Sequence, residues 1–427
     1  MDMLDYRTYI GLGILAFLIV SLILRSKRGY RIPVWSIMAL AAFVTVMSGL
    51  VGLEEMGYVI DIDVVLFLIG MFSLVGLAES SGLLEMVSVW FISRFKRSRD
   101  LVLASSILFG LLAAFAMNDT VALIGPPIAY TISKIARASP NMMFLLLAFS
   151  ITIGSIMTPI GNPQNILVAE NSGIQAPFIT FVFKLSAPTL LNLIIVPLIL
   201  LKIFKVKNEK IEVGLIPQET IKDRRDALLA ALGLTTSIVV LTVNDLFELS
   251  GLPHVTRRGF IPFIIAAGTY AFSRNPRKLI SNVDWGTIIF FIAMFVTTEG
   301  IWRSGVLTPL EFIMNSKQEG AMAYLVIAMI SVAMSQLISN VPFTKLFIMH
   351  MQNLGYTGAD VNVWLALAAF STVAGNLTIL GAASNIIIIE ALESRMNATI
   401  SFFEFLRVGL LITLVNVAAY LAFFVIF

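Results

Sequence analysis

The chain has 427 residues, of which 58% are hydrophobic, only 13% are charged and none is cysteine, and its mean hydropathy is +0.92. A soluble domain is about half apolar and about one-quarter charged, so this chain has too few charged residues to cover two soluble domains. The absence of cysteine excludes disulfides, thiolate zinc sites and thiol nucleophiles together. We therefore predict an all-α polytopic membrane protein, because about 20 apolar residues form one spanning helix.

The net charge of +3 comes from basic residues in short loops between apolar runs, a distribution typical of topology signals rather than of nucleic-acid binding. The first apolar run, Tyr9–Leu24, leads directly into Arg25, Lys27, Arg28 and Arg31 without a small-residue cleavage site. We interpret it as a first span rather than a signal peptide. The predicted location is the plasma membrane, crossed many times, with both termini outside.

The next apolar runs are Pro33–Leu53 and Val64–Leu77, followed by a short amphipathic run, Leu83–Phe95. The tract Leu101–Ile135 is then apolar throughout, except at Asn118-Asp119-Thr120, and both of its ends are basic. If both ends lie in the cytoplasm, the tract forms either two spans or a re-entrant hairpin with Asn118 at its tip. A polar tip at membrane depth must face protein or water, and we favour a hairpin over residues 101–136.

A different interruption is predicted within residues 141–171. Phe144–Thr158 is apolar, Pro159-Ile160-Gly161-Asn162-Pro163-Gln164-Asn165 breaks the run, and Ile166–Ala169 resumes it. Proline cannot continue a hydrogen-bonded helix and glycine weakens one, so we expect one span with an unwound middle. Phe178–Leu201 is a further span, and residues 202–226, with seven Lys or Arg, are predicted to be a cytoplasmic linker.

The second half of the sequence repeats the first. Asp61 matches Asp284 at a spacing of 223, Asn118 matches Asn340 at 222, and Gly161 and Asn165 match Gly381 and Asn385 at 220. This predicts two repeats, residues 1–201 and 227–427, the second with a hairpin at 320–355 and a broken helix at 360–394. Counting spans makes the two repeats inverted, an arrangement typical of secondary transporters, with the site at the repeat interface.

Four polar interruptions form the candidate substrate and ion site, and no residue is assigned a catalytic role. Helix N-termini favour an anion, whereas unwound carbonyls and amide oxygens can hold a small cation. The candidate residues are Asn118, Asp119, Thr120, Gly161, Asn162, Gln164, Asn165, Ser339, Asn340, Asn376, Thr378, Gly381, Ser384 and Asn385. We expect Na⁺ near Asn118, Asp119 and Asn340, with Na⁺ or H⁺ as the coupling ion and no other cofactor. The simpler alternative is that Asn118, Thr120, Ser339 and Ser384 only cap helices.

Asp119 is the strongest candidate for a role in binding the coupling ion or a proton, because an intramembrane carboxylate is costly and usually functional. Its counterpart in the second repeat is Val341, so any coupling role is asymmetric. Glu299 and Arg303 are four residues apart, which fits a structural pair on one helix face. Lys345 either faces an anion or extends toward the membrane surface, and Glu170 and Glu390 are expected at the membrane interface.

These motifs resemble the ion transporter superfamily, in the branch of arsenite permeases, NhaD-type sodium/proton antiporters and divalent-anion/sodium symporters. The resemblance is greatest to a general anion permease, and it covers nearly the whole chain. The motifs that carry it are Met117-Asn118-Asp119-Thr120, Thr158-Pro159-Ile160-Gly161-Asn162-Pro163-Gln164-Asn165, Ser335-Gln336-Leu337-Ile338-Ser339-Asn340-Val341-Pro342 and Gly375-Asn376-Leu377-Thr378 with Gly381-Ala382-Ala383-Ser384-Asn385.

In the symporters, both tips read Ser-Asn-Thr and bind sodium and substrate. Here Met117, Asp119 and Val341 depart from that pattern, which weakens the case for dicarboxylate recognition and for two symmetric sodium sites. The resemblance also implies a homodimer that moves a transport domain against a scaffold.

We therefore expect a secondary active transporter that moves a small anion by alternating access, coupled to a Na⁺ or H⁺ gradient, with arsenite or antimonite as the leading substrate. The alternative within the class is a Na⁺/H⁺ antiporter of the NhaD type. An intramembrane hydrolase would need a second carboxylate or a Ser/His set, which the repeat partner of Asp119 does not provide. A channel or an ATP-driven pump remains as a third class, and because the sequence has no P-loop, a pump would need a soluble ATPase subunit.

Overall fold

The computed structural model describes residues 6–25, 32–211, 217–273, 275–281, 283–308, 316–396 and 399–427. Within these ranges the chain forms 19 α-helices and short 3₁₀ turns, and its extended segments pair only at one isolated bridge between Arg97 and Lys210. Eight helical segments are long and apolar enough to cross a membrane by length and composition. The all-α polytopic fold predicted from the composition is therefore confirmed. Arg274 and the basic residues Lys27, Arg28 and Arg31 lie outside the described residues.

The first half begins with five helices and continues into a hairpin and a broken helix. The five helices are α1 (Tyr6–Arg25), α2 (Val34–Met47), α3 (Met56–Val59), α4 (Ile62–Ser80) and α5 (Leu83–Ile92). The hairpin consists of α6 (Ser98–Ala116) and α7 (Asn118–Ala136), joined at Met117. The broken helix consists of α8 (Pro140–Gly154) and α9 (Pro163–Asn171), separated by the 3₁₀ turns η2 (Ser155–Met157) and η3 (Pro159–Gly161). The long helix α10 (Pro177–Ile203) ends this half.

The second half repeats this order. Its outer helices are α11 (Arg224–Leu249), α12 (Phe260–Phe272), α13 (Pro276–Ser281) and α14 (Trp285–Arg303). Its hairpin consists of α16 (Gly320–Ile338) and α17 (Asn340–Asn353), joined at Ser339. Its broken helix consists of α18 (Val361–Val373) and α19 (Ala383–Met396), separated by η5 (Ala374–Asn376) and η6 (Ile379–Gly381), and α20 (Phe402–Ile426) follows. Both predicted hairpins and both predicted breaks are present; the division of the chain at residues 202–226 stays a prediction.

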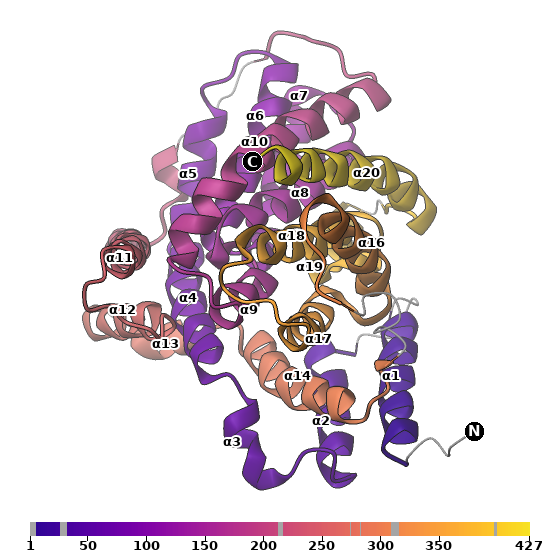
Figure 1. The fold of residues 1–427 in the computed structure, drawn as a ribbon. Helices are drawn as coiled ribbons and strands as arrows, with labels where there is room; N and C mark the ends of the chain where they lie inside the picture. The colour runs from indigo at the N-terminus through magenta and orange to yellow at the C-terminus, as the bar shows by residue number, and fades with distance from the viewer. Residues whose placement is uncertain are drawn as a thin grey trace.

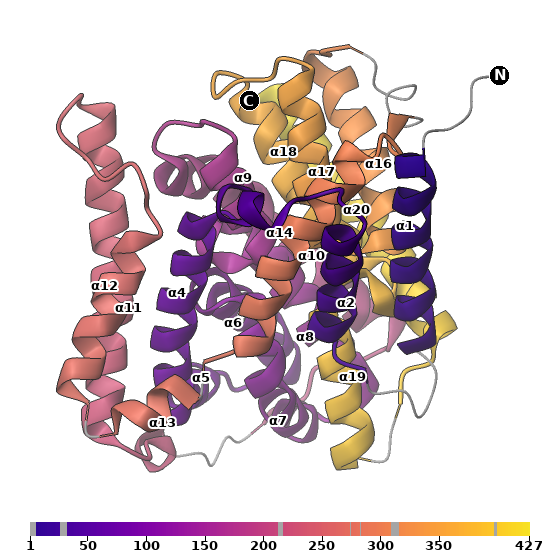
Figure 2. The same ribbon diagram turned by 90° about the horizontal axis from the view of Figure 1, so that it is seen from below.

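The two halves exchange contacts reciprocally. Helix α2 packs on α14 of the second half, and α12 packs on α4 of the first half, as Figures 1 and 2 both show. The hairpin arm α7 packs on α19, and α17 packs on α9, so each hairpin also touches the broken helix of the other half. This reciprocity is what a two-fold relationship between duplicated halves produces, because each contact then has a counterpart.

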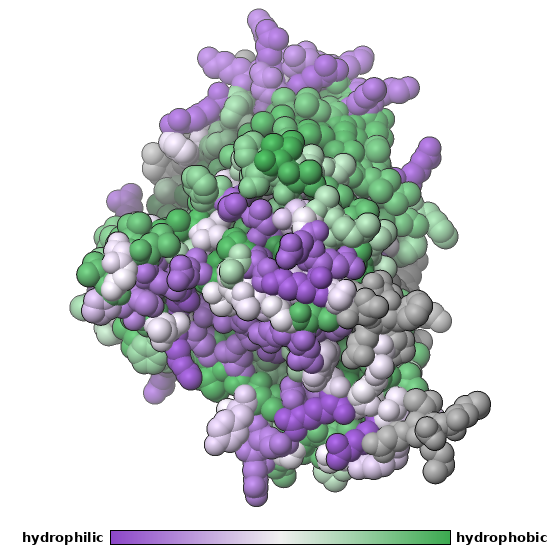
Figure 3. Space-filling view, viewed as in Figure 1, coloured by the Kyte–Doolittle hydropathy of each residue, from purple (hydrophilic) through white to green (hydrophobic). Residues whose placement is uncertain are grey.

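The helix breaks lie in the interior and the long uninterrupted helices lie at the periphery. Within its most apolar stretch, 89% of the segment Pro140–Met157 is buried, against 28% for α11 and 33% for α20. Figure 3 shows a broad hydrophobic area over α10 and α20, bounded at its upper edge by hydrophilic residues. Phe183 and Leu198 of α10 and Leu414 of α20 are exposed. An apolar face of this kind suits contact with lipid. The irregular backbone of the breaks lies inside the protein, because such backbone is tolerated at membrane depth only where protein or water covers it.

Candidate functional site

Both hairpins turn at a non-glycine residue in the left-handed region. Met117 has φ +65° and Ser339 has φ +69°, and each directly precedes the asparagine that starts the returning arm. Such angles are uncommon outside glycine and persist only where the surroundings hold them in place. The two turns place Asn118 and Asn340 in the interior, 5% and 7% exposed.

One asparagine in each half holds its helix break in shape. The Nδ2 of Asn165 donates to the carbonyl oxygens of Ser155 at 3.0 Å, Ile156 at 3.2 Å and Thr158 at 2.9 Å. The Nδ2 of Asn385 donates to the carbonyls of Gly375 at 2.7 Å and Thr378 at 3.2 Å. Unwinding a helix leaves carbonyl groups that need partners, and these side chains supply them.

Each break is also tied to the outgoing arm of its own hairpin, at matching positions. Thr158 donates through Oγ1 to the carbonyl of Ala114 on α6, and Thr378 donates through Oγ1 to Oε1 of Gln336 on α16 at 2.7 Å. Gln336 in turn donates to the carbonyl of Ala374 at 2.9 Å. The hairpin and the break of each half therefore form one connected polar unit.

The two units meet through a threonine. The hydroxyl of Thr372, on α18 of the second half, accepts from Nδ2 of Asn162 at 3.3 Å and from Nε2 of Gln164 at 3.2 Å. The oxygen of Asn162 accepts from the backbone N–H of Asn165 at 2.8 Å, which caps α9. Asn162 therefore caps α9 and also makes a contact between the halves that capping does not require. Ser339, one of the residues for which capping is the simpler alternative, makes no side-chain capping hydrogen bond to α17.

Several buried oxygens at the breaks have no hydrogen-bond partner among the described residues. They are Oδ1 of Asn118, Asn165, Asn376 and Asn385, and Oγ of Ser384. A buried acceptor without a partner costs about 1–3 kcal/mol, so a group found at several related positions calls for an explanation. A small cation, or a solute with hydroxyl donors, would satisfy them.

Donors lie close to these acceptors. The first N–H groups of an α-helix have no partner within the helix, and α7 and α17 both begin at the hairpin tips, at Asn118 and Asn340. Asp119 lies in the first turn of α7, half-buried, and Thr120 is buried beside it. At the second tip Val341 is buried in the position of Asp119, which leaves a carboxylate at one tip only.

Comparison with known proteins decides the family. A sequence model described as "Citrate transporter" (CitMHS) matches residues 16–369, most of the chain. The chain belongs to the citrate transporter family.

Relatives of this family member include an uncharacterized transporter of Mycobacterium tuberculosis, 28% identical over 84% of each chain. The inner membrane protein YbiR of Escherichia coli is 29% identical over 68% of this chain and 71% of that protein. A silicon efflux transporter of Oryza sativa is 26% identical over 89% and 90%. The crystal structure of the YdaH transporter of Alcanivorax borkumensis, described as having an unusual topology, matches with a TM-score of 0.58 at 14% identity over 98% of each chain, a likeness of fold alone.

The site of this citrate transporter family member includes residues that sequence reasoning missed. Gln336, Thr372, Asn192 and Asn416 all join the polar network: Asn376 donates to Oδ1 of Asn416 at 3.3 Å, and Asn416 donates to Oδ1 of Asn192 at 2.7 Å. Asn192 and Asn416 are single amides inside the apolar runs of α10 and α20. Their spacing of 224 residues is close to the repeat offset and could have identified them.

Charged residues outside the breaks differ in their contacts and in their exposure. Arg303 pairs with Glu299 at 2.6 Å, which confirms the predicted helix-face pair. Lys345 donates to Oδ1 of Asn171 at 3.0 Å, and the choice between an anion-facing and a surface-seeking role stays a prediction. Glu390 is exposed and Glu170 is half-buried, and their position at the membrane interface stays a prediction.

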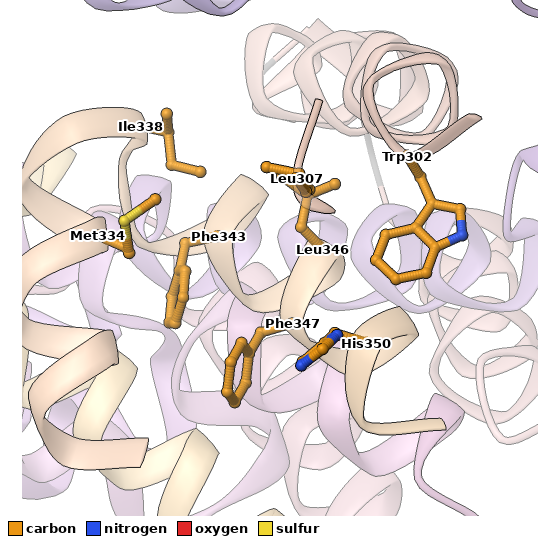
Figure 4. Close-up of a pocket in the computed structure, with 8 residues that line it drawn as sticks. All are labelled: Trp302, Leu307, Met334, Ile338, Phe343, Leu346, Phe347 and His350. Atoms are coloured by element: carbon orange, nitrogen blue, oxygen red, sulfur yellow. The ribbon is translucent and has the colours of Figure 1, made fainter. Parts of the chain in front are cut away.

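An apolar cavity beside the second hairpin is distinct from the polar site (Figure 4). Its lining residues come from the region of α14, α16 and α17, and are Trp302, Leu307, Met334, Ile338, Phe343, Leu346, Phe347 and His350. None of the candidate site residues is among them. Aromatic packing such as that between Phe343 and Phe347, with ring centroids 5.4 Å apart, makes this a packing region, with little to bind an anion.

Proposed function

We propose that this membrane transporter is a secondary active transporter that moves a small oxygen-rich anion or its conjugate acid, coupled to Na⁺ or H⁺. The observation that carries the proposal is the set of buried oxygens without partners at two helix breaks, next to the first N–H groups of the hairpin arms α7 and α17. The same small region thus offers acceptors for a cation and donors for an anion. Binding the two together would neutralise charge that is costly to bury separately.

The oxygen atoms available at the breaks indicate the kind of cation that could bind. Amide and carbonyl oxygens are hard, uncharged ligands, and Asp119 adds one carboxylate at the first tip. Such a set suits a monovalent cation such as Na⁺ better than a soft transition metal, which prefers thiolate or imidazole. Asn118, Asp119 and Asn165 would hold the ion in the first half, and Asn385 would supply the equivalent oxygen in the second.

The names of relatives suggest the range of substrates to test. A citrate transporter family and a silicon efflux transporter point to oxygen-rich solutes, which range from an organic tricarboxylate to a small oxyacid. Arsenite and antimonite have the same character, and arsenous acid needs only hydrogen-bonding groups. Among these we favour arsenite or antimonite, moved by alternating access of the two halves.

The test is flux in proteoliposomes. Purified protein would be reconstituted and assayed with arsenite, silicate, citrate, sulfate and phosphate, each under an inward Na⁺ gradient, an inward H⁺ gradient or neither. Gradient-driven accumulation of at least one solute, lost in Asn118→Ala with folding retained, is expected. Equal flux with and without a gradient would indicate a channel and would contradict the proposal.

A second candidate is a Na⁺/H⁺ antiporter without an anion substrate, favoured by the single carboxylate Asp119 at one hairpin tip. It predicts Na⁺-driven proton movement in liposomes that contain no added anion, and abolition of that movement in Asp119→Asn. In our preferred mechanism Asp119→Asn instead lowers solute flux by roughly tenfold or more, corresponding to at least about 1.4 kcal/mol. Proton movement that needs no anion would decide for the antiporter.

A further inference from the structure

A line of three buried asparagines leads from the second helix break into the long helices α20 and α10. Asn376, in η5, donates from Nδ2 to Oδ1 of Asn416 on α20 at 3.3 Å. Asn416 donates from Nδ2 to Oδ1 of Asn192 on α10 at 2.7 Å, and Asn192 donates to the carbonyl oxygen of Pro188 at 2.9 Å. All three side chains are fully buried, so bulk water does not compete for these hydrogen bonds.

The hydrogen bonds of this line have a fixed direction. A backbone carbonyl can only accept, so Asn192 turns its NH₂ group toward Pro188 and its oxygen toward Asn416. Asn416 and then Asn376 must each donate toward α10 in the same way, because the network of hydrogen bonds decides which end of an amide faces a partner. The oxygen of Asn376 is the end that remains, and it is buried without a partner among the described residues.

The amide of Asn385, in the same break, is committed in the same sense. Its Nδ2 donates to the carbonyls of Gly375 and Thr378, and its Oδ1 has no partner within the described part of the chain. Both amides of the second break therefore present oxygen rather than nitrogen. Two such acceptors favour a ligand that brings hydrogen-bond donors or positive charge, and they disfavour an oxyanion without protons, which has only acceptors itself.

The second break lies directly against α20. A Cβ at Gly409 of α20 would lie 2.3 Å from the carbonyl oxygen of Asn376 and 2.8 Å from that of Leu377, so a larger residue there would displace the break. Helices α10 and α20 are themselves in contact and lie next to one another in Figure 1. The line of asparagines is thus held between closely packed elements.

The first half carries the amide of this line but not its end at the break. Thr189-Leu190-Leu191-Asn192 and Thr413-Leu414-Val415-Asn416 occupy equivalent positions in the two halves. At the repeat offset, however, Ile156 stands where Asn376 would be, and its apolar side chain is fully buried. The simpler alternative is that the two amides only hold α10 and α20 together, as asparagines do between membrane helices.

We propose that Asn192 and Asn416 are positioning residues, which fix the amide of Asn376 so that the second break accepts hydrogen bonds from hydroxyl groups of the solute. The solute class is then an oxyacid that keeps hydroxyl protons. A site matched to a hydroxyl group rejects an analogue without it, because the buried polar groups of the site are then left unpaired. This inference rests on the proposed function and narrows its solute to a form with hydroxyl protons.

The test uses Asn416→Leu and Asn192→Leu, which roughly keep the size of the side chain and remove one member of the line. The matched control is Tyr420→Phe, because the hydroxyl of Tyr420 shares a hydrogen bond with Thr189 at 2.6 Å across the same two helices, also fully buried. That hydrogen bond leads to no residue of the break. Flux of arsenite and of sulfate would be measured in proteoliposomes at neutral pH, where arsenous acid keeps its hydroxyl protons and sulfate has none.

We expect the wild type and Tyr420→Phe to prefer arsenite strongly. In Asn416→Leu the amide of Asn376 is free to turn its NH₂ group toward the solute. The ratio of kcat/KM for arsenite to that for sulfate should then fall roughly tenfold, or about 1.4 kcal/mol, mainly through a higher KM for arsenite. Asn192→Leu should act in the same direction but less, because Asn416 still accepts from Asn376.

An unchanged ratio in Asn416→Leu, or an equal fall in Tyr420→Phe, would overturn the positioning role, and the second result would favour the simpler alternative. Thermal unfolding in detergent checks that each variant is folded. If Asn416→Leu does not fold, Asn192→Leu decides, and an unchanged ratio there would count equally against the proposal.

A Na⁺ titration separates an acceptor for the solute from an acceptor for a cation. If the half-saturating Na⁺ concentration rises in Asn416→Leu while the ratio of arsenite to sulfate stays the same, recognition of a hydroxyl group is wrong. A wild type that moves sulfate as well as arsenite would overturn this inference alone and leave the proposed function standing. A wild type that moves neither of these solutes, nor silicate, citrate or phosphate, would contradict the proposed function and this inference with it.

Discussion

The two helix breaks share a framework but differ in what they present. In both, an asparagine side chain holds the unwound carbonyls and a threonine ties the break to its hairpin. The first break adds Asn162 and Gln164, which reach across to Thr372, and stands near a tip that carries Asp119. The second break adds Asn376, which is linked to Asn416, and stands near a tip with Val341.

This difference separates what the duplicated fold needs from what the individual site does. The features that repeat are Asn165 with Asn385, which satisfy carbonyl groups of the breaks, and Thr158 with Thr378, which tie each break to its hairpin. Among the features that do not repeat, the contacts of Asn162 and Gln164 with Thr372 satisfy no backbone group of a break. We infer that the first half carries the larger part of solute and ion recognition, and three substitutions test how far the comparison holds.

The largest effect is expected from Gly161→Ala. A Cβ at Gly161 would lie 2.1 Å from the carbonyl oxygen of Ser155, a backbone atom that cannot turn aside, so the whole break must shift. Overpacking typically costs about 1–3 kcal/mol, and we expect the upper end together with loss of transport. Thermal unfolding in detergent and flux in proteoliposomes measure the two.

Gly381→Ala provides the matched comparison in the second half. There the Cβ would lie 2.9 Å from the carbonyl oxygen of Ala374 and 3.1 Å from Oε1 of Gln336, and a side chain can rearrange. We expect a smaller fall in melting temperature than for Gly161→Ala. Equal falls would show that the two breaks are equally rigid and would remove this part of the comparison.

A moderate effect is expected from Thr372→Val, which keeps the shape but removes the hydroxyl that accepts from Asn162 and Gln164. The amide of Gln164 would lose its partner, at about 1–3 kcal/mol for a buried group left unsatisfied, whereas Asn162 would keep its bonds to the carbonyl and hydroxyl of Ser155. Solute affinity should fall accordingly, measured as an increase in the KM of flux.

The control is Thr152→Val, 220 residues earlier, at the same place in the first half. Its hydroxyl donates only to the carbonyl of Ala148 on its own helix, so its loss should change KM little. A fall in affinity of the same size for both variants would mean that the hydroxyls serve the helices and not the site.

The smallest effect concerns a surface contact between the halves. Glu55 accepts from the backbone N–H of Gly52 at 2.8 Å and from Arg303 at 2.8 Å. The Gly52 hydrogen bond, and then Arg303, hold the pKa of the Glu55 carboxyl group below its usual value. Arg303→Gln should lower the melting temperature slightly near neutral pH.

The sign of the pH dependence follows from the lowered pKa. A carboxyl group whose pKa is lower in the folded state stabilises that state above its unfolded pKa, and the stabilisation is lost as the pH falls through the folded pKa. The difference between wild type and Arg303→Gln should therefore shrink in acid. A difference that grows in acid would contradict this assignment.

Much of the fold could be predicted from the sequence because its signals are local. Long apolar runs and the interruptions at Asn118 and Gly161 predict spans, hairpins and breaks, and the repeat offset relates the halves. The site was predicted at the level of motifs. The partners of those motifs were not, because the contacts of Thr372 with Gln164 and of Asn416 with Asn192 join residues more than 200 positions apart.

Glu170 shows the limit most clearly. Its position near the end of an apolar run predicts a carboxylate at the membrane interface. A carboxylate packed against another helix could occupy the same position in the sequence. Only the packing of α9 on α4 sets its neighbours, and the apolar pattern of α4 carries no information about which helix covers its first turn. Pairing between helices of similar hydropathy depends on shape, which a single sequence does not display.

The exchange of helices between halves has a consequence for biosynthesis. The first turn of α4 is bound to Gly259, 196 residues later in the chain, so at about 5–20 residues per second the ribosome needs about 10–40 s to deliver the partner of a helix already made. During that interval the face of α4 that α12 later covers has only lipid or the insertion machinery beside it. Two separately expressed halves should consequently each be degraded alone and rescue one another when produced together.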